Sequence, residues 1–153
     1  MPFFLELVSY GEGRDDASAE FAAVNPAVVA RSMAEFSKPE YRVGVLKVGV
    51  PVNMAFVEVH PRPVYEILYS REEAIDYYRR AAEEARVPSI YLSQGVSNET
   101  FQYALELAAE AGVNFSSVLC GRTTWKDGVT VFVDKGLRAL EDWLNQESHL
   151  EKR

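Results

Sequence analysis

Hydrophobic residues are distributed along this chain in two alternating patterns. In the first, nearly every side chain of a short run is apolar, which is typical of strands buried on both faces of a sheet. In the second, apolar residues recur every three or four positions, which predicts helices with one apolar side. The short runs, each an expected strand, lie at 3–8, 43–50, 89–92 and 117–120. A segment with the helical pattern follows each of them.

Helix start and stop signals support this alternation. Asn25 and Pro26 predict an N-cap followed by proline at the first helical position, and this helix is expected to end near 37–39. Ser70 and Glu73 form a capping box at the start of the second helix. The remaining signals are an N-cap at Ser97 for a helix over 98–111, its end at Gly112, a loop over 121–127, and the apolar positions Leu137, Leu140, Trp143 and Leu144 of a last helix.

Four successive strand-and-helix units predict an α/β fold with a parallel sheet and right-handed crossovers. No glycine-rich linker divides the units, and 153 residues suit one compact domain or one half of a larger barrel. Two architectures therefore stay open: a small doubly wound sheet, or four consecutive units of an eight-unit (β/α) barrel. A complete barrel takes about 250 residues, so this chain would form about half of one.

Composition excludes several classes of protein. With 23 acidic and 16 basic residues the net charge is -7, so the positive footprint of a nucleic-acid-binding protein is missing. Cys120, His60 and His149 are too few for a zinc site, and no apolar run reaches the roughly 18 residues of a membrane span. We therefore expect a cytoplasmic protein with no metal, no nucleic-acid partner and no membrane anchor. Cys120 is expected to pack as a small core residue rather than to act as a nucleophile, and His60 to lie in a solvated loop.

Lys47 is the most informative charged residue, because it interrupts the apolar run of a predicted strand. Its neighbours Leu46 and Val48 would be desolvated, and a solvated charge rarely occupies such a position. Burial among apolar groups favours the neutral amine, which can attack a carbonyl group and form a Schiff base. The alternative is an edge-strand lysine whose ammonium group reaches solvent.

Glu6 is likewise the only charged residue in the run 3–8. A carboxyl group held among apolar side chains suits a general acid or base. The alternative is an ion pair, with Arg122 or with Lys47. In either case we expect Glu6 and Lys47 on adjacent strands, with their side chains directed into one shared interior.

Two loops that follow predicted strands carry anion-binding features. In 92–97, Gly95 allows close backbone approach, Ser93 offers a hydroxyl group, and the N-terminus of the next helix favours anions. In 119–122, Arg122 can hold a phosphate with two parallel N–H bonds. If the four strands are the last four of a barrel, these loops follow the seventh and eighth strands, where barrels frequently bind phosphate.

The sequence resembles the class I, or Schiff-base, tagatose-1,6-bisphosphate aldolases, which are (β/α)₈ barrels. The matching stretches are 45–53, 92–97 and 118–125, which read VLKVGVPVN, LSQGVS and VLCGRTTW. By this resemblance, Lys47 would form a Schiff base with the keto sugar or with dihydroxyacetone phosphate, and Glu6 would be the acid/base carboxylate. The residues that would hold a substrate phosphate are Ser93, Gly95, Leu119, Gly121 and Arg122.

The sequence departs from the family pattern in two ways. Gly49 stands where an acidic residue is expected two positions after the lysine, which bears on substrate choice. The family's first four βα units have no counterpart, so the resemblance implies the C-terminal half of a barrel over 1–146, followed by a polar tail at 147–153. Because a half-barrel has two unpaired strand edges, we expect a homo-oligomer, pairing with a separate N-terminal half-barrel, or a truncated gene product.

The activity implied by the resemblance is the aldol cleavage of a ketohexose bisphosphate to dihydroxyacetone phosphate and glyceraldehyde 3-phosphate, with no metal and no cofactor. Two alternatives stay open. One is a related aldolase that cleaves a sulfofructose phosphate, whose anion pocket would accept a sulfonate. The other is a non-catalytic half-barrel that retains sugar-phosphate binding.

Overall fold

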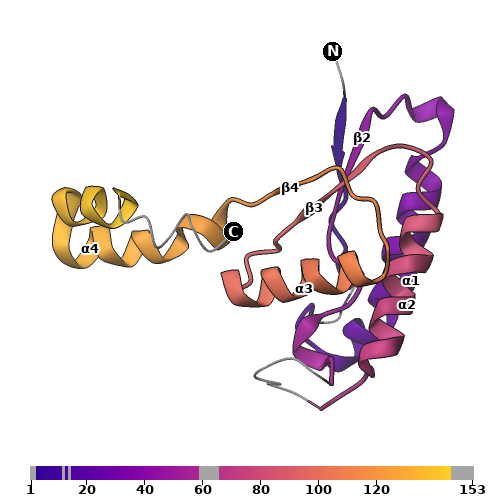
Figure 1. The fold of residues 1–153 in the computed structure, drawn as a ribbon, viewed down its shortest axis with the longest axis horizontal. Helices are drawn as coiled ribbons and strands as arrows, with labels where there is room; N and C mark the ends of the chain where they lie inside the picture. The colour runs from indigo at the N-terminus through magenta and orange to yellow at the C-terminus, as the bar shows by residue number, and fades with distance from the viewer. Residues whose placement is uncertain (1–2, 12, 14, 59–65, 146–153) are drawn as a thin grey trace.

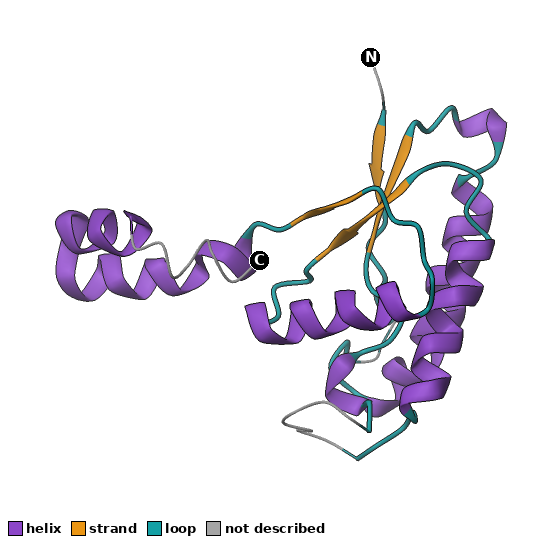
Figure 2. Ribbon diagram, in the orientation of Figure 1, coloured by secondary structure: helices purple, strands orange, loops and turns teal. Residues whose placement is uncertain are grey.

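The computed structural model describes residues 3–11, 13, 15–58 and 66–145. Figure 1 and Figure 2 show its four parallel strands, which follow the chain order β1 (Phe4–Glu6), β2 (Val45–Val48), β3 (Ser89–Leu92) and β4 (Ser117–Leu119). The predicted α/β fold and parallel sheet are confirmed. Consecutive strands of a barrel lie side by side in chain order, as they do here. In a doubly wound sheet, the spatial order of the strands reverses at one point.

Helices connect the strands and follow the last one. They are α1 (Ala19–Phe36), η1 (Pro39–Tyr41), η2 (Met54–Phe56), α2 (Arg71–Glu83), α3 (Asn98–Glu110) and α4 (Arg122–Asn145), of which η1 and η2 are short 3-10 turns. The predicted capping box is confirmed: Ser70 Oγ accepts the Glu73 N–H at 3.1 Å, and the Glu73 carboxylate accepts the Ser70 N–H at 2.8 Å. The predicted cap of α3 at Ser97 is also confirmed.

The predicted start of the first helix is wrong. Ser18 caps α1 by accepting the Phe21 N–H, and Pro26 lies inside the helix rather than at its first turn. Asn25, predicted as the N-cap, is buried instead, and its side chain donates to the Pro51 carbonyl at 3.0 Å. A long-range hydrogen bond has therefore replaced the local cap that the Asn-Pro pair indicated.

A hydrogen bond from Tyr69 makes Pro26 tolerable inside α1. Proline has no N–H to give to the carbonyl four residues earlier, which belongs to Ala22. The Tyr69 hydroxyl donates to that carbonyl at 2.6 Å. Burial raises the pKa of Tyr69 to about 12, so the hydroxyl remains a hydrogen-bond donor even in moderately alkaline solution.

The loop predicted over 121–127 is also wrong, because α4 begins directly after β4. The Thr124 N–H donates to the Gly121 carbonyl at 2.9 Å, which turns the chain into the helix at once. Gly136, with a φ of 80°, divides α4 into two segments. The second segment folds back so that the Trp143 ring lies over Gly128, and Figure 1 shows this helical pair projecting away from the sheet.

The helices cover one face of the sheet. Leu46 and Val48 of β2 and Tyr91 of β3 are buried with the apolar residues of α1, α2 and α3. Side chains alternate along a strand, so Glu6 and Lys47 lie on the opposite face, over which the described residues place no helix. The predicted burial of the strands on both faces is therefore wrong for β1 and β4, the two edge strands, most of whose residues are exposed.

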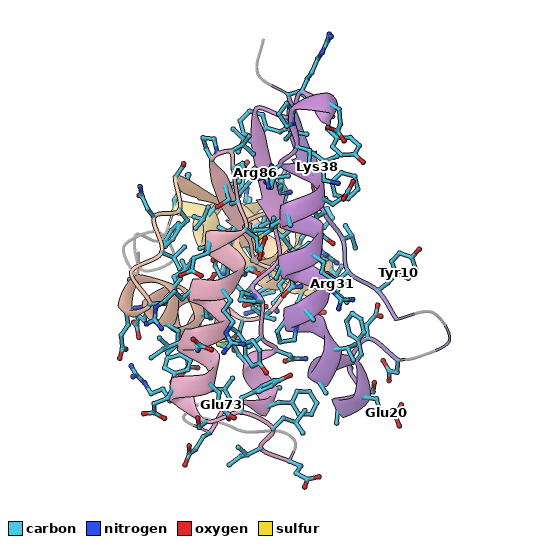
Figure 3. All side chains as sticks on the ribbon, turned by 90° about the vertical axis from the view of Figure 1, so that its right-hand side faces the viewer. Tyr10, Glu20, Arg31, Lys38, Glu73 and Arg86 are labelled. Carbon is cyan, nitrogen blue, oxygen red and sulfur yellow. The ribbon has the colours of Figure 1, made fainter. Side chains whose placement is uncertain are left out.

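The outer surface of the helical layer is polar. Figure 3 looks onto α1 and α2 from outside, where Glu20, Arg31 and Glu73 are exposed. None of the described helices is long and apolar enough to cross a membrane. His60, His149 and the tail 147–153 lie outside the described residues, and the domain boundary after residue 146 stays a prediction.

Candidate active site

An ion pair between neighbouring strands stands at the centre of the site. Glu6 of β1 lies in register with Lys47 of β2, so parallel pairing directs both side chains to one face. The distance from Lys47 Nζ to Glu6 Oε2 is 2.8 Å. The sequence left the partner of Glu6 open between Lys47 and Arg122, and the structure selects Lys47. A carboxylate at this distance can take a proton from the amine and return it.

The two members of the pair differ in burial. The Lys47 side chain is 18% exposed, and its neighbours Leu46 and Val48 are fully buried, as the sequence pattern predicted. The Glu6 side chain is 50% exposed, so the expectation of a carboxyl group enclosed by apolar residues is wrong. The reason is its place in β1, an edge strand whose neighbours Leu5 and Leu7 are only partly buried.

The loop after β3 allows a ligand to approach the backbone closely. Gln94 and Gly95 have φ values of 53° and 78°, in the left-handed region that favours glycine. Ser93 before them is buried, and its carbonyl accepts the Val96 N–H at 3.2 Å. Ser97 then caps α3, so the N-terminus of a helix, which favours anions, follows the loop.

Arg122 lies over this loop. Its guanidinium carbon is 3.5 Å from the position that a Cβ atom on Gly95 would occupy. Within the described part of the chain, Arg122 forms no ion pair with a carboxylate. An arginine with no carboxylate partner, beside a glycine loop and a helix N-terminus, is suited to bind an anion such as a phosphate.

Two side chains near the start of α4 donate hydrogen bonds to the same loop. Thr123 Oγ1 donates to the Val96 carbonyl at 2.7 Å, and Lys126 Nζ donates to the Gly95 carbonyl at 3.0 Å. Sequence reasoning missed both residues because it predicted a loop over 121–127. In a helix, side chains three or four positions apart are neighbours, so Lys126 lies next to both Thr123 and Arg122 once α4 is known to begin at Arg122.

All seven residues predicted for the site line one cavity of about 210 Å³. Its lining comprises Glu6, Lys47, Ser93, Gly95, Leu119, Gly121 and Arg122, together with Leu92, Gln94 and Trp125. A larger cavity of about 450 Å³ adjoins it and shares Glu6, Ser93, Gln94 and Arg122 among its lining residues. The fold thus gathers an amine, a carboxylate and an unpaired guanidinium group at the carboxyl end of the sheet, where barrel enzymes have their active sites.

In the ranges that the structure describes, no group of three or more His, Cys, Asp or Glu residues is placed to hold a metal ion. Cys120 is partly buried and packs against the hydrophobic core, in agreement with the packing role predicted for it.

Comparisons with known proteins identify the family of the chain. Residues 1–127 match the DeoC/LacD family of aldolases. Among curated relatives, tagatose 1,6-diphosphate aldolase 2 of Enterococcus faecalis is 51% identical over 96% of this chain, and tagatose 1,6-diphosphate aldolase of Staphylococcus aureus is 45% identical over 94% of it. In both cases the match spans 44% of the relative, so the chain covers less than half the length of these proteins. The match over most of its residues means that the chain belongs to the DeoC/LacD aldolase family.

Proposed function

We propose that this chain provides the nucleophile, the acid/base group and a phosphate site of a class I aldolase. The reaction is the cleavage of a ketohexose bisphosphate, such as tagatose 1,6-bisphosphate, to dihydroxyacetone phosphate and glyceraldehyde 3-phosphate. The observation that carries the proposal is the Lys47–Glu6 contact of 2.8 Å in a cavity that also holds the guanidinium group of Arg122. Relatives named tagatose 1,6-diphosphate aldolase support the choice of substrate.

Lys47 acts as the nucleophile. When substrate arrives, the Glu6 carboxylate takes a proton from the Lys47 ammonium group, and the neutral amine attacks the ketone carbon. Glu6 then returns the proton to the oxygen of the resulting carbinolamine, which leaves as water and gives a protonated imine. This imine is the electron sink that the later bond cleavage needs.

Glu6 acts again in the cleavage step. Its carboxylate removes the proton from the hydroxyl group on the fourth carbon of the sugar, and the bond between the third and fourth carbons breaks. The electron pair of that bond moves into the imine to form an enamine, and glyceraldehyde 3-phosphate leaves. Protonation of the enamine and hydrolysis of the imine release dihydroxyacetone phosphate and regenerate Lys47.

The phosphate group next to the ketone is held by the two loops at the carboxyl end of β3 and β4. Arg122 contributes charged hydrogen bonds, Ser93 a hydroxyl group, and Gly95 and Gly121 accessible backbone. Leu119 completes the wall of this part of the cavity. Because sugar phosphates do not cross membranes unaided, we expect the reaction to take place in the cytoplasm.

The sheet edges require further strands to complete the site. Both β1 and β4 lie at an edge, and a barrel would pair each of them with another strand. Large apolar side chains are exposed on these two strands and on α4, among them Phe4, Leu119, Val129, Phe132 and Val133. We expect a second copy of this chain, or a separate N-terminal half-barrel, to cover them.

A non-catalytic role is a second candidate, favoured by the exposure of Glu6. A carboxylate that is half exposed to water is less enclosed than general acid/base catalysis in a barrel normally requires. In this case, Arg122 and the β3–α3 loop would still bind a sugar phosphate, but Lys47 would not turn it over.

Borohydride trapping tests the proposal. The purified chain is incubated with dihydroxyacetone phosphate and borohydride, which reduces any Schiff base to a stable amine, and intact-protein mass spectrometry counts the adducts. We expect one adduct, mapped to Lys47, which disappears in Lys47→Ala. Lys135→Ala is the matched control, because this lysine is exposed on α4 outside the lining of the cavity.

The outcomes separate the two candidate functions. An adduct of equal yield in Lys47→Ala would remove Lys47 from the mechanism. A folded wild-type chain that binds dihydroxyacetone phosphate but gives no adduct would favour the non-catalytic role. Parallel incubation with a sulfofructose phosphate distinguishes an aldolase of sulfo-sugars, which would yield more adduct from that substrate than from tagatose 1,6-bisphosphate.

A further inference from the structure

We infer that Gln94 binds the aldehyde half of the substrate: its side-chain amide hydrogen-bonds a hydroxyl group of that half, and Gly49 makes room for it. This inference rests on the proposed function. It concerns two positions to which the predicted site gives no role, and one of them, Gly49, is the position at which the family pattern led us to expect an acidic side chain.

Gly49 is the reason why Gln94 can occupy its position. A Cβ atom added to Gly49 would lie 2.6 Å from Gln94 Nε2 and 3.1 Å from the carbon of the same amide group. Any other residue at position 49 would displace this amide. If side chains continue to alternate between the two faces of the sheet after β2, a side chain at position 49 would lie on the same face as Lys47. The Gln94 amide therefore fills the space beside the nucleophile that a larger residue 49 would take.

The backbone of Gln94 adopts an unfavourable conformation. Its φ of 53° lies in the left-handed region, which is unfavourable for a residue with a side chain. The conformation directs the side chain toward the end of β2, whereas Arg122 lies over Gly95 from the side of β4. The Gln94 amide thus lies beside Gly49, after β2, whereas the Arg122 guanidinium group lies beside Gly95.

Arg122 and Gln94 would therefore contact different parts of the substrate. With the phosphate at Arg122 and the ketone carbon at Lys47, the remainder of the sugar extends toward the Gln94 side of the cavity. Gln94 lines both the 210 Å³ cavity and the adjoining 450 Å³ cavity, as Glu6, Ser93 and Arg122 also do, so it can contact a ketohexose bisphosphate that extends from one cavity into the other.

The chemistry of the amide fits a hydroxyl group. Within the described residues, the Gln94 side chain makes no hydrogen bond and is exposed, so both its donors and its acceptor are open to a ligand. An amide can donate to and accept from a hydroxyl group at once, which an acidic residue cannot do when ionised. A neutral residue here also avoids repulsion of the substrate phosphates.

Calorimetric titration of two ligands tests the inference. Tagatose 1,6-bisphosphate contains the aldehyde half and dihydroxyacetone phosphate lacks it. Titrations use the full chain in a Lys47→Ala background, which prevents turnover, with Gln94→Ala or Gly49→Ala added. Gln102→Ala is the matched control, because Gln102 is an exposed glutamine on α3 outside both cavities.

We expect Gln94→Ala to weaken the binding of tagatose 1,6-bisphosphate roughly three- to tenfold, as for the loss of one neutral hydrogen bond, with dihydroxyacetone phosphate changed less than about twofold. Gly49→Ala should give the same pattern because its methyl group displaces the amide. The double variant should be no weaker than Gln94→Ala alone, since both substitutions act on one group.

Three results would overturn the inference: equal losses for the two ligands in Gln94→Ala, hexose binding equal to that of Gln102→Ala, or additive effects of the two substitutions. The absence of binding of either ligand to any version of the chain would refute the proposed function and this inference together. Failure to trap an adduct in the wild-type chain would count against catalysis alone, since the titrations do not depend on turnover.

Discussion

Arg122 contributes a charge that no carboxylate within the described residues balances. It lies in a cavity with the Lys47–Glu6 pair, which is internally neutral, so Arg122 gives the cavity a net positive charge. Its position over Gly95 also lets the guanidinium group act together with backbone N–H groups of the loop. We therefore expect this arrangement to attract a phosphate although the whole chain carries a net charge of -7.

Replacing Arg122 with alanine should therefore weaken the binding of dihydroxyacetone phosphate by about 1.5–3 kcal/mol, the range for hydrogen bonds to charged groups. Isothermal titration calorimetry measures the change. Arg138→Ala, which removes an exposed arginine of α4, is the control and should leave the affinity unaltered. Unchanged binding in Arg122→Ala would reassign this residue to a structural role.

The environment of single residues was predictable where a local pattern decides it. The apolar neighbours of Lys47 along one strand predicted its low exposure, and a capping partner three residues away predicted the role of Ser70. The burial of Glu6 was not predictable in the same way, because its run is as apolar as that of Lys47. The difference is that Glu6 lies on an edge strand and Lys47 on an inner strand. The order of strands in the sheet cannot be read from a local sequence pattern.

Among the elements, α1 depends on a residue far away in sequence. Tyr69 donates to the Ala22 carbonyl that Pro26 leaves without a partner, and the two groups are 47 residues apart. Removing the hydroxyl in Tyr69→Phe leaves a buried carbonyl unsatisfied, so we expect a loss of about 1–3 kcal/mol in the free energy of unfolding. Urea denaturation followed by circular dichroism measures this change.

The neighbouring Tyr77 supplies the control for this prediction. It contacts the Tyr69 ring edge to face at 5.4 Å, and it is only partly buried. Tyr77→Phe should therefore cost well under about 1 kcal/mol. If the two variants are equally stable, the hydroxyl of Tyr69 does not compensate for Pro26.

The two segments of α4 are held together by contact over Gly128. A Cβ atom there would lie 2.7 Å from the Trp143 ring, so Gly128→Ala must push the segments apart. Overpacking costs typically 1–3 kcal/mol, which outweighs the gain of about 1 kcal/mol in helix propensity. We expect a red-shifted Trp143 emission in a Trp125→Phe background. Thr130→Ala, exposed on the same helix, should leave the emission unchanged.

Both errors in the predicted elements have one physical cause. Asn25-Pro26 and the segment 121–127 carry local turn signals that contacts distant in sequence override. The Pro51 carbonyl accepts a hydrogen bond from Asn25, and the Val96 carbonyl accepts one from Thr123 at the start of α4. The strands and the capped helices α2 and α3 were predictable because local and tertiary preferences agree there.

At the scale of the whole molecule, the sheet has one covered and one open face. Its helical face contains the core, including Leu46, Val48 and Tyr91, whereas the face with Glu6 and Lys47 has no second layer among the described residues. Apolar strands predicted burial on both faces. That prediction describes a closed barrel, and the chain spans less than half the length of the relatives that it matches.

The exposed apolar residues of β1, β4 and α4 should therefore drive association. Sedimentation velocity over a range of concentrations should give a mass above that of the 17.2 kDa chain, because edge strands pair readily with other strands. Phe4→Lys places a charge on the open edge at β1 and should weaken this association at least about tenfold, as expected for a charge facing an apolar contact. Tyr41→Lys, which changes an exposed aromatic residue in η1, should not weaken the association.

A chain that stays monomeric at all concentrations would exclude a second copy as the partner at the sheet edges. An N-terminal half-barrel would then be the expected partner, and its addition should allow an adduct to be trapped at Lys47.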